Sequence, residues 1–268
     1  MNNWYKKLKK YQEIIRISNN EMFASPGNFI GRIVIFCLRI SLFGIIYPYV
    51  FKSSNLTSIN GISVIQIVWS LALVQIIYQF SRKTYQDIRD EIMSGQIETK
   101  LNKPYSFLNF VFVDAMGKMP IQAIIYAVTI VLLLGTVFGI PHFTFVQIIG
   151  LIILFILGVI LFTLNMILLA ICAFWMENPD PVYWIIGKLS WFVNGTFIPL
   201  AILPASFRTI ATYFPFSAPF FLGRIFEIST LTGISQLIII QLIWIVVFAF
   251  IIKYLYRLGI KKVSINGG

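Results

Sequence analysis

The sequence predicts an all-α integral membrane protein with six transmembrane helices. Of its 268 residues, 58% are apolar and only 12% are charged, whereas soluble domains average about 45–50% apolar and about 25% charged residues. The apolar residues form long blocks of about 20 residues, the length that a helix needs to cross a bilayer. Helices are expected because backbone polar groups must be satisfied within lipid and the blocks lack the alternation of a β-barrel.

The apolar blocks give the positions of the six predicted spans: 29–50, 62–81, 107–139, 147–175, 182–203 and 236–256. An even number of spans places both termini on the same side of the membrane. Lysine and arginine gather before the first span, between the second and third spans, and after the last span. The positive-inside rule therefore predicts that these three regions are cytoplasmic and that residues 1–268 form a single multi-pass transmembrane domain.

The net charge of +11 points to membrane lipids as a partner, and we expect no nucleic-acid binding. The basic residues flank hydrophobic spans, where anionic lipid headgroups are available to them. Cys37 and Cys172 both lie within apolar blocks and are interpreted as small apolar residues. His142 is the only histidine and has no set of ligands around it, so no metal site is expected.

The segment 3–24 is predicted to be an amphipathic interface helix that precedes the first span. Trp4, Leu8, Tyr11 and Ile15 follow one another at helical spacing, with charged residues between them. Ser25-Pro26-Gly27 would end this helix and turn the chain into the bilayer. The pattern leaves two roles open, an anchor on the membrane surface and a holder for a partner protein.

The segment 82–105 is the most informative part outside the predicted spans. Its pattern predicts a short charged helix up to Met93, a stop at Gly95, and a second short element that carries Ile97 and Leu101. Pro104 follows, ahead of the third span. Alternating charge around a few apolar residues suits a helix that docks on a protein, although an ordinary solvated connector has a similar pattern.

The segment 204–222 is apolar and aromatic but is interrupted by Pro204, Pro215 and Pro219. Each proline removes a backbone donor and ends a helix, so a continuous span is excluded. We expect a pair of short re-entrant or interface-lying helices here, on the extracellular side between spans five and six.

The last two segments resemble those of the permease subunits of type-2 ATP-binding-cassette (ABC) exporters, in particular a six-span bacterial branch. The resemblance covers nearly the whole chain and rests on two groups of residues. In the first loop they are Ile88-Arg89, Ser94-Gly95, Leu101 and Lys103-Pro104; later they are Gly195 to Leu200, Leu203-Pro204 and Phe214-Pro215-Phe216. The loop departs from the family at Glu98-Thr99-Lys100, where a more apolar run is expected.

This resemblance implies a transport subunit in a bacterial plasma (inner) membrane, working with a cytoplasmic ABC ATPase dimer and a second permease subunit, either the same or a homologous chain. The chain has no G-x-x-x-x-G-K-[ST] loop, so ATP and Mg²⁺ are expected in the partner ATPase. No catalytic residue or cofactor is therefore expected here. The family pattern implies that the segment 82–105 is a coupling helix, with the following contact residues: Ile88, Arg89, Glu91, Gly95, Ile97, Leu101 and Pro104. The corresponding extracellular gate residues are Pro199, Pro204, Phe214 and Pro215.

Charged and polar residues within the spans supply the candidates for a substrate path. Arg39 lies near the middle of the first block, which leaves open whether it snorkels, forms a pair or lines the path. Trp191 and Asn194 lie one turn apart beside Gly195, and the family places spans two and five at the dimer axis. The predicted path residues are Arg39, Trp69, Trp191, Asn194 and Phe197.

Other polar groups near or within the spans are interpreted as structural. Asp114 and Lys118 are four residues apart and should pair. Lys188 is expected to pair with Glu177 or Asp180, while Gln75 and Asn165 are assigned to hydrogen bonds between helices.

The apolar, aromatic interior favours an amphiphilic substrate, either cationic and drug-like or lipid-linked, which is moved out of the cell. An ion-coupled secondary transporter or channel is the alternative. It is disfavoured because no Asp or Glu lies in the middle of any predicted span. An intramembrane enzyme ranks last, because the sequence offers no recognisable nucleophile and base.

Overall fold

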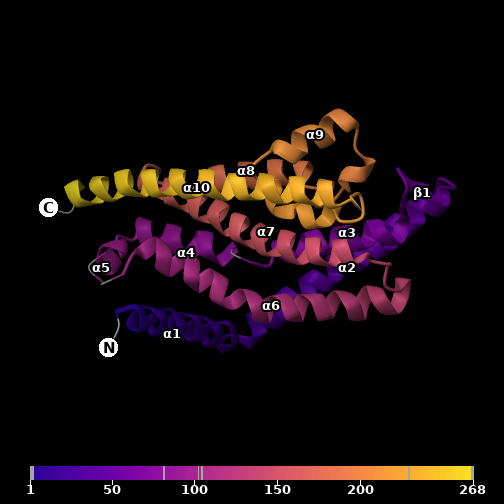
Figure 1. Ribbon diagram of the computed structural model, residues 1–268. Helices are drawn as coiled ribbons and strands as arrows, with labels where there is room; N and C mark the ends of the chain where they lie inside the picture. The colour runs from indigo at the N-terminus through magenta and orange to yellow at the C-terminus, as the bar shows by residue number, and fades with distance from the viewer. Residues whose placement is uncertain (1–2, 81, 102, 104, 229, 267–268) are drawn as a thin grey trace.

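The computed structural model describes residues 3–80, 82–101, 103, 105–228 and 230–266, which form an elongated bundle of helices (Figure 1). Its α-helices are α1 Asn3–Ala24, α2 Pro26–Ser53, α3 Val64–Ile77, α4 Arg82–Met93, α5 Ile97–Leu101, α6 Phe107–Phe138, α7 Phe145–Ile171, α8 Asp180–Val193, α9 Ala205–Tyr213 and α10 Leu231–Asn266. Three short 3₁₀ helices are η1 Cys172–Phe174, η2 Leu200–Ile202 and η3 Ala218–Arg224. A small antiparallel hairpin pairs β1 Ser58–Ile59 with β2 Ile62–Ser63.

The segment predicted as an amphipathic interface helix forms α1, which runs alongside α6 (Figure 1). Ser18 Oγ donates a hydrogen bond to Asp114 Oδ1 on α6, at 2.5 Å. Ile15 approaches Gly117 so closely that a side chain at Gly117 would touch it. The helix is therefore held by contacts with α6, in addition to any contact with a membrane surface.

Four of the six predicted spans are helices long and apolar enough to cross a membrane: α2, α6, α7 with its η1 extension, and α10. The other two predicted spans, 62–81 and 182–203, contain the shorter helices α3 and α8, each of 14 residues. A helix of 14 residues rises about 21 Å, less than the roughly 30 Å of a bilayer core. Among the described residues, helix length by itself therefore supports four membrane-spanning helices.

Both ends of the described chain lie at the same end of the bundle. Figure 1 shows the start of α1, the α4 and α5 helices and the last turns of α10 together, with the β1–β2 hairpin at the opposite end. We call the former the terminal end. The α4–α5 hairpin and the two ends of the described chain therefore lie together in the fold.

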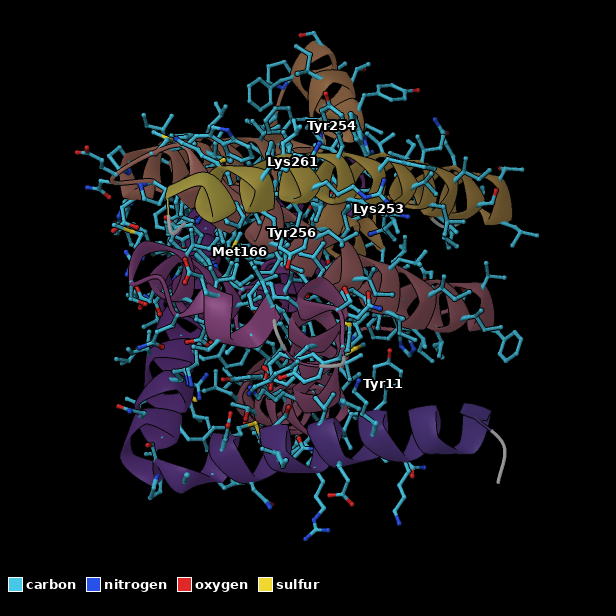
Figure 2. The ribbon with its side chains drawn as sticks, turned by 90° about the vertical axis from the view of Figure 1, so that its left-hand side faces the viewer. Tyr11, Met166, Lys253, Tyr254, Tyr256 and Lys261 are labelled. Carbon is cyan, nitrogen blue, oxygen red and sulfur yellow. The ribbon has the colours of Figure 1, made fainter. Side chains whose placement is uncertain are left out.

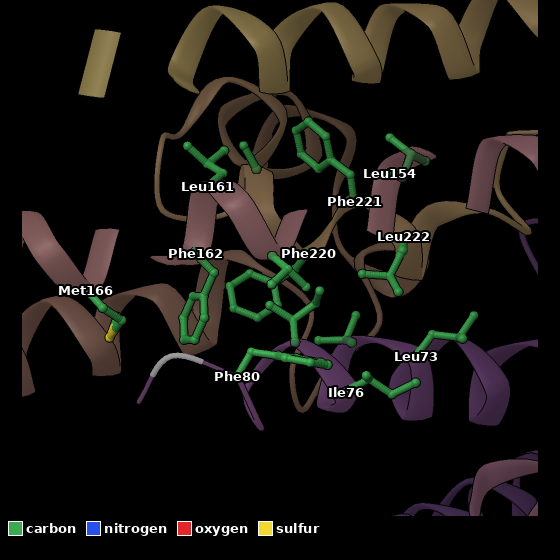
Figure 3. Packing of buried hydrophobic residues seen from close by; sticks show 14 of the residues in the cluster. Leu73, Ile76, Phe80, Leu154, Leu161, Phe162, Met166, Phe220, Phe221 and Leu222 are labelled. Atoms are coloured by element: carbon green, nitrogen blue, oxygen red, sulfur yellow. The ribbon is translucent and has the colours of Figure 1, made fainter. Parts of the chain in front are cut away.

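The core is built where η3 packs between α3 and α7 (Figure 3). Phe220 and Leu222 of η3 are almost fully buried there. Gly158 on α7 faces the carbonyl oxygen of Pro219, and a side chain at this position would overlap that oxygen. The segment 204–222 contains α9 and most of η3, and η3 forms part of the core.

The close approach at Gly158 can be tested by substitution. Gly158→Ala should lower the melting temperature, because the new methyl group meets a backbone oxygen that cannot move easily; overpacking of this kind costs about 1–3 kcal/mol. Gly187→Ala on α8 is the matched control, since no atom lies within 4 Å of its added carbon. Thermal unfolding of the detergent-purified variants checks this, and equal melting temperatures would contradict the packing described.

Candidate functional site

A cavity of about 800 Å³ lies between α2, α3 and α8, with α7 and η3 closing its inner wall. Residues of α1, α4 and α6 also line it. Met166, which lines it, lies in the interior between α10 and α1 in Figure 2. Cavities of about 300–1,000 Å³ hold drug-sized ligands, so the space is large enough for a substrate.

One wall of the cavity contains a network of hydrogen bonds around Tyr78, in the turn after α3. The Tyr78 hydroxyl accepts hydrogen bonds from Asn194 Nδ2 at 2.5 Å and from Thr196 Oγ1 at 3.0 Å. Gln75 donates to the Thr196 carbonyl oxygen at 3.3 Å, and its own Oε1 accepts from Arg39 Nη1 at 3.5 Å. Hydrogen bonds thereby connect five residues from α2, α3 and the turns after α3 and α8, and most of these groups are buried.

Gly195 makes this network possible, because it ends α8 and turns the chain back toward α3. Its φ angle of +77° lies in the left-handed region, which glycine adopts without steric cost. The Thr196 amide then donates to Asn194 Oδ1 at 3.1 Å. A helix that continued through residue 195 would carry Thr196 away from Tyr78.

Aromatic rings surround the network. Tyr78 stacks on Phe220 with ring centroids 4.6 Å apart, and Phe162 meets Tyr78 edge-on at 5.7 Å. On the α8 side, the rings of Trp191 and Phe197 are 5.4 Å apart. The walls are therefore apolar, with a few fixed polar groups between the rings.

Asn165 on α7 also lines the cavity, and it has an unsatisfied polar atom. The residue is 2% exposed, and its Oδ1 has no hydrogen-bond partner among the described residues. An unpaired buried acceptor costs about 1–3 kcal/mol, so this carbonyl is available for a donor from outside the chain.

The carboxylates that line the cavity come from α1, α4 and α6. Asp114 pairs with Lys118 at 2.8 Å, as the sequence predicted, and Glu21 of α1 lies 3.9 Å from the same ammonium. Asp87 on α4 completes this group, and burial raises the pKa of its carboxyl above the ordinary value.

The predicted path residues divide into three that line the cavity and two that do not. Arg39, Trp191 and Phe197 line it. Asn194 does not, but it holds Tyr78, which does. Trp69 points elsewhere: its indole nitrogen donates to the Gly139 carbonyl oxygen at 3.2 Å and its side chain is 4% exposed.

A second group of contacts joins α4 to the start of α8, and we call it the α4–α8 clamp: Tyr85, Arg89, Asp180 and Tyr183. Arg89 Nη1 lies 2.6 and 2.5 Å from the two carboxylate oxygens of Asp180. The Tyr85 hydroxyl donates to Asp180 Oδ1 at 2.8 Å, and its ring stacks on Tyr183 at 4.0 Å. The hydrogen bond from Tyr85, together with Arg89, lowers the pKa of the Asp180 carboxyl below its usual 3.8.

The clamp corrects the partner predicted for Lys188. Asp180 binds Arg89 instead, and the Lys188 ammonium lies over the ring of Trp191, 3.8 Å from its centroid. Sequence spacing favoured a pair between Lys188 and Asp180 because the two are close in sequence. It gives no sign of Arg89, which comes 91 residues before Asp180.

The residues predicted to couple to an ATPase lie mostly inside the chain's own fold. Ile88 and Ile97 are 1% and 0% exposed and join the core. Leu101 is half-buried against that core, Arg89 belongs to the clamp, and Glu91 pairs with Lys100. Gly95 is exposed, with a φ of +73° that ends α4 as predicted. Pro104 lies outside the described residues.

The tip of the α4–α5 hairpin, residues 93–99, is largely exposed to solvent. Met93 is 50% exposed, and the other exposed residues of the tip are Ser94, Gly95, Gln96, Glu98 and Thr99. Sequence reasoning missed Met93 as a contact residue, because helical spacing alone does not tell which apolar residues face the protein. A buried Ile88 and an exposed Met93 have similar patterns until the fold is known.

The predicted gate residues lie around α9 and η2. Pro199 is buried and precedes η2, while Pro204 is exposed and precedes α9. Phe214 follows α9 and packs with Val193 and Leu200, and Pro215 is half-buried beside it. Arg224 joins this region to η3 by donating to Thr212 Oγ1 at 2.6 Å and to Glu227 Oε2 at 3.1 Å.

A double-mutant cycle on Arg89→Ala and Asp180→Ala tests the clamp. The coupling energy in unfolding experiments should be about 0.5–1 kcal/mol, since both side chains are partly exposed and therefore screened. Because the pKa of Asp180 is lowered by folding, this stabilisation is present above its unfolded pKa. It is lost as the pH falls through the folded pKa.

The matched control is the pair Arg16 and Glu13 on α1, whose atoms are 3.6 Å apart with side chains 73% and 52% exposed. Its coupling energy should be close to zero. A clamp cycle no larger than this control would show that α4 and α8 are not held together by the ion pair.

Comparison with known families agrees with this geometry. A family model described as "ABC-2 family transporter protein" matches residues 34–267, from within α2 to the end of the chain's last helix. A search of curated proteins finds no match. The family match covers most of the sequence and includes the clamp, the tip and most of the residues that line the cavity. The chain therefore belongs to the ABC-2 transporter family and is a multi-pass membrane permease of the type-2 ABC class, whose membrane component is distinct from the ATPase.

Proposed function

We propose that this permease is the membrane subunit of an ATP-driven exporter. It would move an amphiphilic drug-like or lipid-linked substrate out of a bacterial cell, across the plasma (inner) membrane. The termini and the tip would face the cytoplasm, in keeping with the basic residues around them. ATP and Mg²⁺ would bind to a partner ABC ATPase dimer, and a second permease, the same or a homologous chain, would complete the transport path.

The observation that carries this proposal is that one short hairpin has both an exposed tip and a fixed attachment to the cavity wall. The tip offers Met93 to solvent. Arg89 and Tyr85, on the same helix, bind the first residue of α8. The helix α8 in turn supplies Lys188 and Trp191 to the cavity. A movement of the tip is thereby passed to residues that would touch a substrate.

ATP binding would close the ATPase dimer and displace the tip. The α4–α8 clamp would carry α8 with it and change the width of the cavity between α8 and α2. The substrate would bias this equilibrium by the difference in its affinity for the two packings, since a ligand can shift states only by that difference. The gate residues around α9 and η2 would open or close the opposite end of the path.

The tip as the site of ATPase contact can be tested with Met93→Asp. We expect an ATPase with a phosphate-binding loop to co-purify with the tagged native protein from its host. The variant should lose this partner, because a carboxylate buried in an apolar contact costs about 2 kcal/mol or more, which is about thirtyfold in affinity. Mass spectrometry of the co-purified proteins measures the loss. The melting temperature of the permease should not change, since Met93 is exposed.

Met176→Asp is the matched control, since Met176 is also an exposed methionine but lies in the link between η1 and α8. It should keep the ATPase. Equal loss in both variants would move the contact away from the tip. Recovery of the native protein alone, with transport into liposomes in the absence of ATP, would replace the exporter with the ion-coupled transporter.

A further inference from the structure

The cavity is lined by more basic than acidic side chains. Among the described residues, its carboxylates are Glu21, Asp87 and Asp114, and its basic residues are Arg32, Arg39, Lys83, Lys118 and Lys188. Lys118 pairs with Asp114, whereas Arg39, in the middle of α2, donates to Gln75, and Lys188, an exposed residue on α8, lies over the ring of Trp191. The lining therefore carries a net positive charge, whose potential is strengthened by the apolar parts of the walls.

The two tryptophan rings that line the cavity, Trp184 and Trp191, already lie under a lysine of the protein. The Lys188 ammonium lies 3.8 Å from the centroid of the Trp191 ring and 5.6 Å from that of Trp184. A ligand cation placed over these rings would compete with Lys188 and meet its charge at close range. These two tryptophan rings, the best cation–π partners in the lining, therefore give no reason to expect a cationic substrate.

Two further features define the ligand. Asn165 lines the cavity with a buried Oδ1 that has no partner among the described residues, so it can accept a hydrogen bond from a ligand O–H or N–H group. Phe162, Met166 and Leu169, on the same helix, supply apolar surface next to it. A suitable ligand combines an apolar chain or ring, a hydrogen-bond donor and a negative charge.

We propose that the cavity binds an amphiphile with an anionic head, such as a phosphate monoester, whose charge lies near Arg39 and Lys188. The proposal deepens the proposed exporter function by naming the charge of its substrate, and it rests on that function for its biological meaning. Cationic drug-like compounds are then poor substrates. The anion could belong to a membrane lipid or to a soluble amphiphile, because both present the same head chemistry.

The test is direct binding to the purified full-length protein, with whatever subunits co-purify, in phosphatidylcholine nanodiscs without nucleotide. Radiolabelled dodecyl phosphate is the probe, and unlabelled dodecyl phosphate and dodecyltrimethylammonium are the competitors. We expect the anion to compete at least tenfold better than the cation with the same chain. Equal competition, or a preference for the cation, would overturn the proposal.

Variants locate the binding to this cavity. Lys188→Gln should weaken dodecyl phosphate binding about tenfold, and Lys188→Glu should remove the preference for the anion. Lys253→Gln, an exposed lysine on α10 that does not line the cavity, should leave binding unchanged (Figure 2). Asn165→Leu should also weaken binding. If Lys253→Gln and Lys188→Gln have the same effect, the anion binds to the basic surface and the proposal is wrong.

Phosphatidic acid added to the nanodiscs distinguishes the two sources of the anion. Displacement of dodecyl phosphate assigns the cavity to a lipid, and undiminished binding assigns it to a soluble amphiphile; both outcomes support an anionic ligand. The assay needs no ATP hydrolysis, so it is independent of the exporter test. Anion binding without an ATPase partner would refute the exporter alone, whereas an ATPase partner with no preference for the anion would refute this inference alone.

Discussion

The ion pair between Arg89 and Asp180 joins the α4–α5 hairpin to the cavity wall formed by α8. On one side is the α4–α5 hairpin, which is seated on the core by Ile88 and Ile97 and exposes Met93. On the other side is α8, whose residues line the cavity. Arg89 binds both carboxylate oxygens, and Tyr85 adds a hydrogen bond and a stacked ring, so the joint is fixed in direction. A single aliphatic contact would not fix the angle between two helices in this way.

The inner cavity shows how polar groups are kept within an apolar bundle. Tyr78 receives hydrogen bonds from Asn194 and Thr196, and Gln75 links this pair to Arg39. Each of these polar groups would cost free energy if it were buried without a hydrogen-bond partner. Because each has a partner, the network is compatible with an apolar bundle. The unpaired carbonyl of Asn165 is the exception along this wall. A ligand that supplies the missing donor to this carbonyl would gain binding free energy there.

Much of the fold could be predicted from the sequence, because long apolar blocks and glycine stops have local causes. The helix α1, the break at Gly95 and the four long spans all follow from patterns within a few turns of chain. The lengths of α3 and α8 did not follow. A hydropathy average counts apolar residues and does not detect where a helix ends. The turn after α8 contains Gly195, whose positive φ accompanies the contacts around Tyr78.

The site was harder to predict, since its residues meet only in the folded chain. Three of the residues predicted for the substrate path, Arg39, Trp191 and Phe197, line the cavity. Arg39 could be singled out from the sequence because a charge within a span is unusual. Sequence reasoning also paired Lys188 with the wrong group and assigned Ile88 and Ile97 to a partner's surface, although both are buried. Apolar residues on a short helix face either the core or a partner, and only the packing decides which.

The most direct measurement is a pair of distances by pulsed electron–electron double resonance, on the permease bound to its ATPase. Cys37 and Cys172 are first replaced by serine, and spin labels are placed at Gln86→Cys on α4, Ile185→Cys on α8 and Leu38→Cys on α2. Trapping with ATP should leave the α4–α8 distance unchanged while the α8–α2 distance shifts, because the clamp moves α8 with the hairpin. If the α4–α8 distance changes as much as the α8–α2 distance, the clamp does not transmit the movement and the mechanism is wrong.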